Sequence, residues 1–288
     1  MNKINLFRKQ KYANIEQKSQ EWLNIRKNFI TASNVYKIFE KNNEYIEYIK
    51  EKASGISSFK GNNATYFGEI FEPVAREIYM YIVNEYVEEF GLIINSKLPY
   101  CAVSPDGVTE SDRLLEIKCP YTRKITGDIP NHYYHQIQLQ LHVCDCEECD
   151  FLECKFVEIS LNEFNKSLQS INNPKKFMCI CKTNNFEVDC YMNGPANTIK
   201  NLSNFSRYST NNTYKHIKIT DVPKNNYWNN CMERYYKLDF ISLQTVNKNN
   251  EWLNIHQKDL NETIPFVEEC RKDITKLNNI KQCCECEF

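Results

Sequence analysis

The sequence contains no apolar run that approaches the ~18 residues of a membrane-spanning helix, so we do not expect a membrane protein. The first eleven residues are polar and basic and lack the apolar segment of a secretory signal, which predicts an intracellular protein. The net charge is only −1, so the overall charge does not by itself indicate a nucleic-acid-binding protein. Internal repeats and long linkers are also missing, and 288 residues can bury a core without disulfides.

Arginine is scarce, and charge is unevenly distributed. Of the 36 basic residues only eight are arginine, so a single arginine carries more information here than a single lysine. Residues 1–60 hold 12 Lys and Arg against 6 Asp and Glu, whereas residues 61–160 hold 7 against 17. A basic arm beside an acidic middle is expected if the acidic part binds metal ions and the basic part meets phosphates. A basic and an acidic surface that are both simply solvated would give the same pattern, so charge alone leaves both interpretations open.

Hydrophobic periodicity predicts a mixed α/β core. The strongest helical pattern covers Tyr66 to Glu85, although Pro73 predicts that this helix starts near Glu69 or bends there. The order of helix, strands, helix and strand along the chain favours the α/β class. The other expected elements are strands over 86–94, 100–103, 114–119, 150–159 and 238–246, and helices over 20–27, 33–39, 44–53, 131–143 and 250–277.

Two carboxylates and a lysine are expected to meet on one sheet surface. Side chains alternate along a strand, so Glu116 and Lys118 share one face, and a hairpin would bring Asp106 beside them. Carboxylates suit a hard divalent cation, which can lower the pKa of a bound water, and an ammonium can stabilise charge on a phosphorane. A solvated Glu–Lys pair is the alternative. Glu72, beside the apolar ridge of its helix, is either a surface residue or an inward ligand.

Six short motifs occur in an order that resembles the YqaJ/lambda-exonuclease family, metal-dependent nucleases of the PD-(D/E)xK superfamily. The resemblance covers Gln20–Ile159 and resumes over Ile241–Ile274. The motifs are Trp22-Leu-x-x-Arg26, Ile30-Thr31-Ala32-Ser33, Gly68-x-x-x-Glu72, Ser104-Pro-Asp106-Gly, Leu115-Glu116-Ile-Lys118-Cys-Pro and Tyr133-x-x-Gln136-Ile-Gln138.

The resemblance implies a restriction-endonuclease-like α/β fold. Its core would be a central mixed sheet flanked by helices, with an inserted subdomain and a C-terminal helix. We expect residues 1–160 to form the nuclease core with N-terminal DNA-end-binding helices. Residues 161–235 would be the insertion, and residues 236–288 would add the strand and helix that complete the core.

The resemblance also implies a metal site. Asp106, Glu116 and the backbone carbonyl of Ile117 would ligate Mg²⁺, for which Mn²⁺ could substitute. Glu72 would serve a second metal position or the water around it. Lys118 would position the attacking water and stabilise charge.

The remaining implied site residues bind phosphate or water. Gln136 would help to hold the site's water or phosphate. Arg26, Ser33 and Ser104 match residues that grip the 5′-phosphate of a DNA end, for which a guanidinium fork and small hydroxyls are suited. Lys124 stands where the family has a further phosphate-binding arginine, and it could replace that arginine as a point charge.

The activity implied is magnesium-dependent 5′→3′ digestion of double-stranded DNA from 5′-phosphorylated ends, leaving a 3′ single-stranded tail. The role would be DNA recombination or repair, with a single-strand annealing protein as partner, a ring-shaped homotrimer as assembly and, for a virus, the host cytoplasm as location. The alternatives are a structure-specific endonuclease of the same superfamily and a non-catalytic DNA-binding protein.

The fourteen cysteines form no pair of C-x₂-C knuckles, so we expect packing thiols and no structural zinc. Cys101 is the first cysteine and follows Glu72, which argues against the iron–sulfur cluster of some related nucleases. A cysteine-rich metal-binding module is therefore disfavoured. The groups with a loose zinc-like spacing are Cys144, Cys146 and Cys149, then Cys179 and Cys181, and finally Cys283, Cys284 and Cys286.

Overall fold

The computed structural model describes residues 2–56, 61–184, 187–199, 214–220, 233–273 and 275–276. The strands are β1 (Ile30–Thr31), β2 (Val87–Glu88), β3 (Ile93–Asn95), β4 (Leu98–Val103), β5 (Gly107–Thr109), β6 (Leu114–Lys118), β7 (Glu148–Ile159), β8 (Met178–Asn184), β9 (Glu187–Asn193), β10 (Lys215–Ile219) and β11 (Arg234–Asn247). The helices are α1 (Lys3–Phe7), α2 (Gln20–Arg26), α3 (Asn43–Ser54), α4 (Asn63–Val83), α5 (Asn131–Cys144), α6 (Leu161–Ser170) and α7 (Asn250–Lys272), with 3₁₀ helices η1 (Ala32–Ile38) and η2 (Ala196–Thr198). None of the described helices is long and apolar enough to cross a lipid bilayer.

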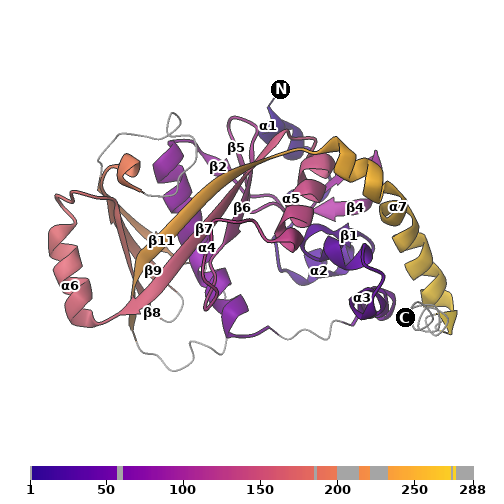
Figure 1. The fold of residues 1–288 in the computed structure, drawn as a ribbon, viewed down its shortest axis with the longest axis horizontal. Helices are drawn as coiled ribbons and strands as arrows, with labels where there is room; N and C mark the ends of the chain where they lie inside the picture. The colour runs from indigo at the N-terminus through magenta and orange to yellow at the C-terminus, as the bar shows by residue number, and fades with distance from the viewer. Residues whose placement is uncertain are drawn as a thin grey trace.

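A mixed eight-stranded sheet forms the centre, in the order β10-β9-β8-β11-β7-β6-β5-β2, and a second sheet has the order β1-β4-β3. The long antiparallel strands β7 and β11 run diagonally through the molecule, with α6 at one end and α3 and α7 at the other (Figure 1). The predicted mixed α/β fold, with its flanking helices and C-terminal helix, is confirmed. The described parts of 161–235 extend this same sheet through β8, β9 and β10, and the domain boundaries stay a prediction.

Helix α4 begins earlier than the proline suggested. The helix runs from Asn63 through Pro73 without ending, so the predicted start near Glu69 is wrong. The side chain of Asn62 accepts a hydrogen bond from the backbone N–H of Thr65 and caps the helix at this earlier point. The apolar ridge beyond Pro73 is buried, and its packing outweighs the backbone hydrogen bond that proline cannot donate.

The single strand expected over 86–94 is wrong, because this segment contributes β2 to the large sheet and β3 to the small one. Gly91 lies between them and donates its N–H to the carbonyl of Ala13 at 2.6 Å. A Cβ at this position would lie 2.2 Å from the carbonyl oxygen of Ile15, so only glycine allows this approach. The backbone of Gly91 is thus hydrogen-bonded to the N-terminal segment instead of to a neighbouring strand, and this separates β2 from β3.

Helix α5 connects the parallel strands β6 and β7. It packs against one face of β6, so the side chains of β6 divide between two different apolar clusters. Leu114 of β6 packs in the same apolar cluster as Ile137 of α5. Leu115 and Ile117 belong to the cluster that includes Ile78 of α4. The alternation predicted for β6 is confirmed: its even-numbered residues face α5 and its odd-numbered residues face α4.

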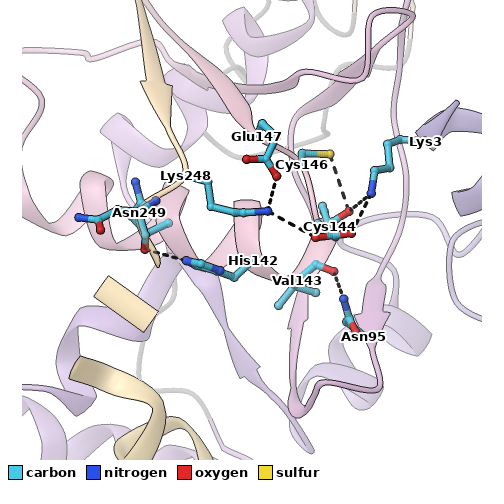
Figure 2. A network of polar contacts seen from close by, with 11 residues as sticks. Lys3, Asn95, His142, Val143, Cys144, Cys146, Glu147, Lys248 and Asn249 are labelled. Atoms are coloured by element: carbon cyan, nitrogen blue, oxygen red, sulfur yellow. Dashed lines mark hydrogen bonds and ion pairs between the residues drawn. The ribbon is translucent and has the colours of Figure 1, made fainter. Parts of the chain in front are cut away.

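The C-terminal end of α5 is held by Lys3, near the N-terminus, and by residues between β11 and α7 (Figure 2). The Lys3 ammonium donates to the carbonyl of Cys144 at 3.2 Å, and Lys248 pairs with Glu147 at 2.5 Å. Cations near the carbonyl end of a helix also oppose its macrodipole. These contacts fix α5 against the sheet on which the candidate site lies.

Gln138 joins α5 to the junction of β11 and α7. Its side chain is fully buried. The amide nitrogen donates to the carbonyl of Asn247 at 2.9 Å, and the amide oxygen accepts from the N–H of Asn249 at 2.8 Å. One side chain therefore satisfies two backbone groups where the last strand turns into the last helix.

We predict that Gln138→Leu lowers the free energy of unfolding by about 1–3 kcal/mol, because the backbone groups of Asn247 and Asn249 lose their buried partner. Urea denaturation followed by circular dichroism measures this change. Gln169→Leu, on the exposed face of α6, is the control and should change stability by less than about 0.5 kcal/mol. Equal effects of the two substitutions would show that the Gln138 bonds contribute nothing specific.

Candidate active site

One cavity of about 200 Å³ brings together almost all the residues singled out from the sequence. It is lined from α2, η1, α4, β4, β6 and α5, segments far apart in the chain. Lys124 and Ile117 are the predicted site residues that do not line it. The predicted residues that do line it are Arg26, Ser33, Glu72, Ser104, Asp106, Glu116, Lys118 and Gln136.

Glu116 lies at the bottom of the site and has no exposed surface. Its carboxylate accepts from the amide of Gln136 at 2.6 Å and from the amide of Gln140 at 2.7 Å, and it pairs with the ammonium of Lys118. Gln140 is a site residue that the motifs missed. Its position four residues after Gln136 was the available signal, because residues four apart share a helix face.

Asp106 is positioned by the backbone of the neighbouring strand. Its Oδ2 accepts the N–H of Ile117 at 2.7 Å, which places it beside Glu116 as the hairpin argument predicted. Burial, together with the negative charges of Glu116 and Glu72, raises the pKa of Asp106 well above its usual value. Burial lowers the pKa of Lys118, but the carboxylates of Glu116 and Asp106 outweigh it and raise that pKa overall.

The donor set fits a hard divalent cation. Three carboxylates, those of Glu72, Asp106 and Glu116, line the cavity, and a cation would relieve the repulsion that raises the pKa of Asp106. Within the described part of the chain, Oε1 of Gln140 is buried without a hydrogen-bond partner. An amide oxygen of this kind can accept from a water of a hydrated cation.

Arg76 links Glu72 to Asp106 and was not singled out from the sequence. Its guanidinium lies 3.5 Å from the carboxylate of Glu72, one helical turn away on α4. It also donates to the backbone carbonyl of Asp106 at 3.2 Å and pairs with Glu89 at 2.5 Å. Glu72 is half-buried at the rim of the cavity, so it is an inward-facing carboxylate held by an arginine.

Arg26 forms the cationic wall of the same cavity. Its guanidinium stacks 3.8 Å from the centre of the Trp22 ring, and one of its nitrogens lies 3.4 Å from Oγ of Ser33. Burial lowers the pKa of Arg26 to about 10, so the side chain stays charged at neutral pH. The indole N–H of Trp22 donates to Ser104 at 3.1 Å, and the Ser104 hydroxyl donates to the carbonyl of Gly91. Ser104 therefore fixes the orientation of Trp22, against whose ring the Arg26 guanidinium stacks.

Lys52 supports Arg26 from behind. This half-buried side chain donates from its ammonium to the carbonyls of Arg26 and Phe29, each at 2.7 Å, at the carbonyl end of α2. Burial, and then the nearby charges of Arg26 and Arg271, lower the pKa of Lys52 to about 7. Nothing in the sequence separated Lys52 from the other lysines.

The predicted contact at Lys124 is not assembled in the structure. Lys124 is exposed and lies outside the cavity lining. Its neighbour Arg123 binds the buried carboxylate of Glu153 at 2.5 Å, and Lys155 holds the backbone of this segment by donating to the carbonyl of Tyr121 at 2.6 Å. The segment is therefore fixed with Arg123, rather than Lys124, turned toward the sheet.

Comparisons with known proteins show the family that part of the chain resembles and the proteins that share its fold. Residues 21–147 match the sequence model of the YqaJ-like viral recombinase domain, so the family resemblance of this part of the chain is confirmed. An uncharacterised protein of Acanthamoeba polyphaga mimivirus is 32% identical over 158 residues. That match covers 48% of this chain and 29% of the viral protein, so the chain spans less than a third of that relative's length.

Solved exonuclease structures share the fold. An alkaline exonuclease (LHK-Exo) of Laribacter hongkongensis aligns over 90% of this chain and 97% of its own, with a TM-score of 0.55 and 18% identity. A second structure of that protein holds dAMP. A phage-related exonuclease of Haemophilus somnus 129PT aligns over 88% and 99% of the two chains, with a TM-score of 0.50 and 12% identity.

We predict that Asp106→Asn weakens Mn²⁺ binding by at least roughly tenfold, because the amide removes a charged ligand while its oxygen can still accept from Ile117. Electron paramagnetic resonance of free Mn²⁺ measures the affinity. Asp128→Asn, an exposed carboxylate outside the cavity, is the matched control and should bind like the wild type. Equal affinities of all three proteins would place the metal elsewhere.

Proposed function

We propose that this chain, whose residues 21–147 form a YqaJ-like viral recombinase domain, is a magnesium-dependent exonuclease that digests double-stranded DNA from 5′-phosphorylated ends. The observation that carries the proposal is that the carboxylates of Asp106 and Glu116 line the same cavity as Arg26. The proposed sites for a divalent cation and for a phosphate would thereby share one cavity. The folds shared with two exonucleases support the same reaction class.

The carboxylate end of the cavity would carry out hydrolysis. Asp106 and Glu116, with the carbonyl of Ile117, would hold Mg²⁺, which when bound supplies charge neutralisation and a water of lowered pKa. Lys118 would orient the attacking water and donate to the phosphate as negative charge develops. Gln136 and Gln140 fix the Glu116 carboxylate by hydrogen bonds, so its orientation does not depend on the substrate.

The Arg26 end of the cavity would select the DNA terminus. A guanidinium stacked on Trp22 has little freedom to turn away, and it can present two N–H groups to a terminal phosphate. The hydroxyl of Ser33 lies beside it. An enzyme that needs this terminal phosphate proceeds from the 5′ end inward, which gives 5′→3′ direction and leaves a 3′ single strand.

The biological setting that we propose follows the family resemblance. DNA ends that carry 3′ tails are substrates for recombination or repair, and a single-strand annealing protein would bind the tails. We further propose a homotrimer, and the host cytoplasm as location for a virus-encoded protein; a viral relative supports the latter.

With Mg²⁺, we predict that the protein degrades linear 5′-phosphorylated duplex and leaves covalently closed circular duplex intact, because only an end can reach the Arg26 pocket. Asp106→Asn should abolish degradation and retain binding of the linear duplex. Gel assays and fluorescence anisotropy measure the two properties. Cleavage of the circle at the rate of the linear duplex would favour the endonuclease. Binding without degradation by the wild type, in Mg²⁺ or Mn²⁺, would favour a non-catalytic DNA-binding protein.

For end recognition, we predict that Arg26→Ala lowers the rate on 5′-phosphorylated ends by roughly ten- to a hundredfold, which corresponds to ~1.5–3 kcal/mol for a charge-assisted contact. The rate on 5′-hydroxyl ends should change little, so the preference for phosphate narrows. Arg26→Lys should restore only part of the preference for 5′-phosphorylated ends, because an ammonium cannot make the two-pronged contact of a guanidinium. Arg8→Ala, which removes an exposed arginine paired with Glu88, is the control. An unchanged preference in Arg26→Ala would refute the assignment of the pocket.

A further inference from the structure

Three buried cysteines lie together on a part of the large sheet that the proposed nuclease reaction does not use. Cys179 and Cys181 alternate along β8, and Cys190 is the antiparallel partner of Cys181 on β9. Residues two apart on a strand, and residues directly opposite across a ladder, share one face of the sheet. The three thiols therefore face the same way, and Met192, the partner of Cys179, completes a square of sulfur-bearing residues.

The spacing of the sulfur atoms fits a shared metal ion. The three Sγ atoms lie within 4.8 Å of one another, and those of Cys179 and Cys190 are 3.4 Å apart. Zinc–thiolate bonds of ~2.3 Å in a tetrahedral site place sulfur atoms ~3.8 Å apart. The Cys179–Cys190 separation is slightly shorter than this value and the other two separations are at most 4.8 Å, so small rotations of the side chains would bring all three sulfur atoms to bonding distance.

The surroundings of the cluster are apolar. All four residues are at most 2% exposed, and they pack in the same hydrophobic cluster as Phe71 and Ile78 of α4. Among the described residues, no His, Asp or Glu side chain joins the three thiols in this cluster. Sulfur ligands without oxygen ligands select soft ions and disfavour Mg²⁺.

We propose that Cys179, Cys181 and Cys190 bind one structural zinc ion as thiolates, with the thioether of Met192 facing the fourth position. Three thiolates in an apolar interior would carry a charge of −3, which zinc reduces to −1 and copper(I) only to −2. Since uncompensated buried charge is costly, zinc is the occupant that this site favours.

The bound ion would fasten the outer strands of the sheet to each other. Structural zinc contributes directly to folding energy. Strands β8 and β9 pair with β11 on one side and β10 on the other, and their sulfur face packs against the helix that carries Glu72. The site thus revises the expectation of packing thiols at these positions. Spacing did not indicate it, because Cys190 joins the C-x-C pair only through the antiparallel pairing of β8 and β9.

Metal reconstitution of the whole protein tests the proposal. The protein is stripped with a chelator under reducing conditions, re-equilibrated with Zn²⁺ in excess Mg²⁺, desalted and analysed by plasma mass spectrometry. We expect about one zinc per chain, as for other structural sites. Co²⁺ should give the near-ultraviolet thiolate charge-transfer band of a sulfur-bound ion. Asp106→Asn should retain both signals, which separates this site from the proposed catalytic one.

Cysteine variants give the matched comparison. Cys190→Ala should lose the bound zinc, the cobalt band and the zinc-dependent rise in melting temperature. Cys144→Ala, which removes an equally buried thiol on α5, should keep all three. If Cys190→Ala does not fold, the presence or absence of the thiolate charge-transfer band in the cobalt spectrum of the wild type tests whether the cysteines bind the ion. A wild type that takes up no zinc, that forms a Cys179–Cys190 disulfide instead, or that binds copper(I) and refuses zinc would overturn the proposal.

Discussion

The burial of one carboxylate, that of Glu116, is the constraint around which this structure is arranged. A charge without solvent access is stable only when it is paired and hydrogen-bonded. Lys118 pairs with it from the same strand, and Gln136 and Gln140 bind it from the helix above. Helix α5 must therefore dock over β6 in one register. The contacts of its C-terminal end with Lys3 and with Asn249, between β11 and α7, serve that requirement (Figure 2).

The basic and acidic segments of the sequence contribute charged residues to the same cavity. Arg26 comes from the basic N-terminal sixty residues, and Asp106 and Glu116 come from the acidic segment that follows. All three line one cavity. Two separate solvated faces, the alternative interpretation of the charge pattern, would not bring these residues together. Their charges are turned inward, where a low dielectric strengthens their electrostatic interaction with a bound phosphate. Trp22 and Lys52 keep Arg26 in that position without neutralising it.

The two faces of the large sheet separate hard from soft ligands. The oxygen ligands Glu116 and Asp106 belong to the cavity beside α5, whereas Cys179, Cys181 and Cys190 pack in the cluster beside α4. If the sulfur cluster binds zinc as we propose, each ion has a site of matching chemistry, and thiolates do not compete for the catalytic cation. Helix α4 contributes to both sites, because Glu72 lies at the rim of one and Phe71 packs against the other.

The sequence by itself determined the fold class, the alternation of β6 and most residues of the cavity, since strand periodicity and motif order are local properties of the chain. It failed where contacts distant in sequence decide: Gly91 divides an expected strand by approaching Ile15, and packing carries α4 through Pro73. Gln140, Arg76 and Lys52 became visible only once the chain had folded around Glu116, Asp106 and Arg26. Tertiary structure also brought Cys190 to Cys179, because pairing across a sheet is set by the partner strand and not by spacing along the chain. It turned Arg123 inward in place of Lys124, because the buried carboxylate of Glu153 binds the guanidinium.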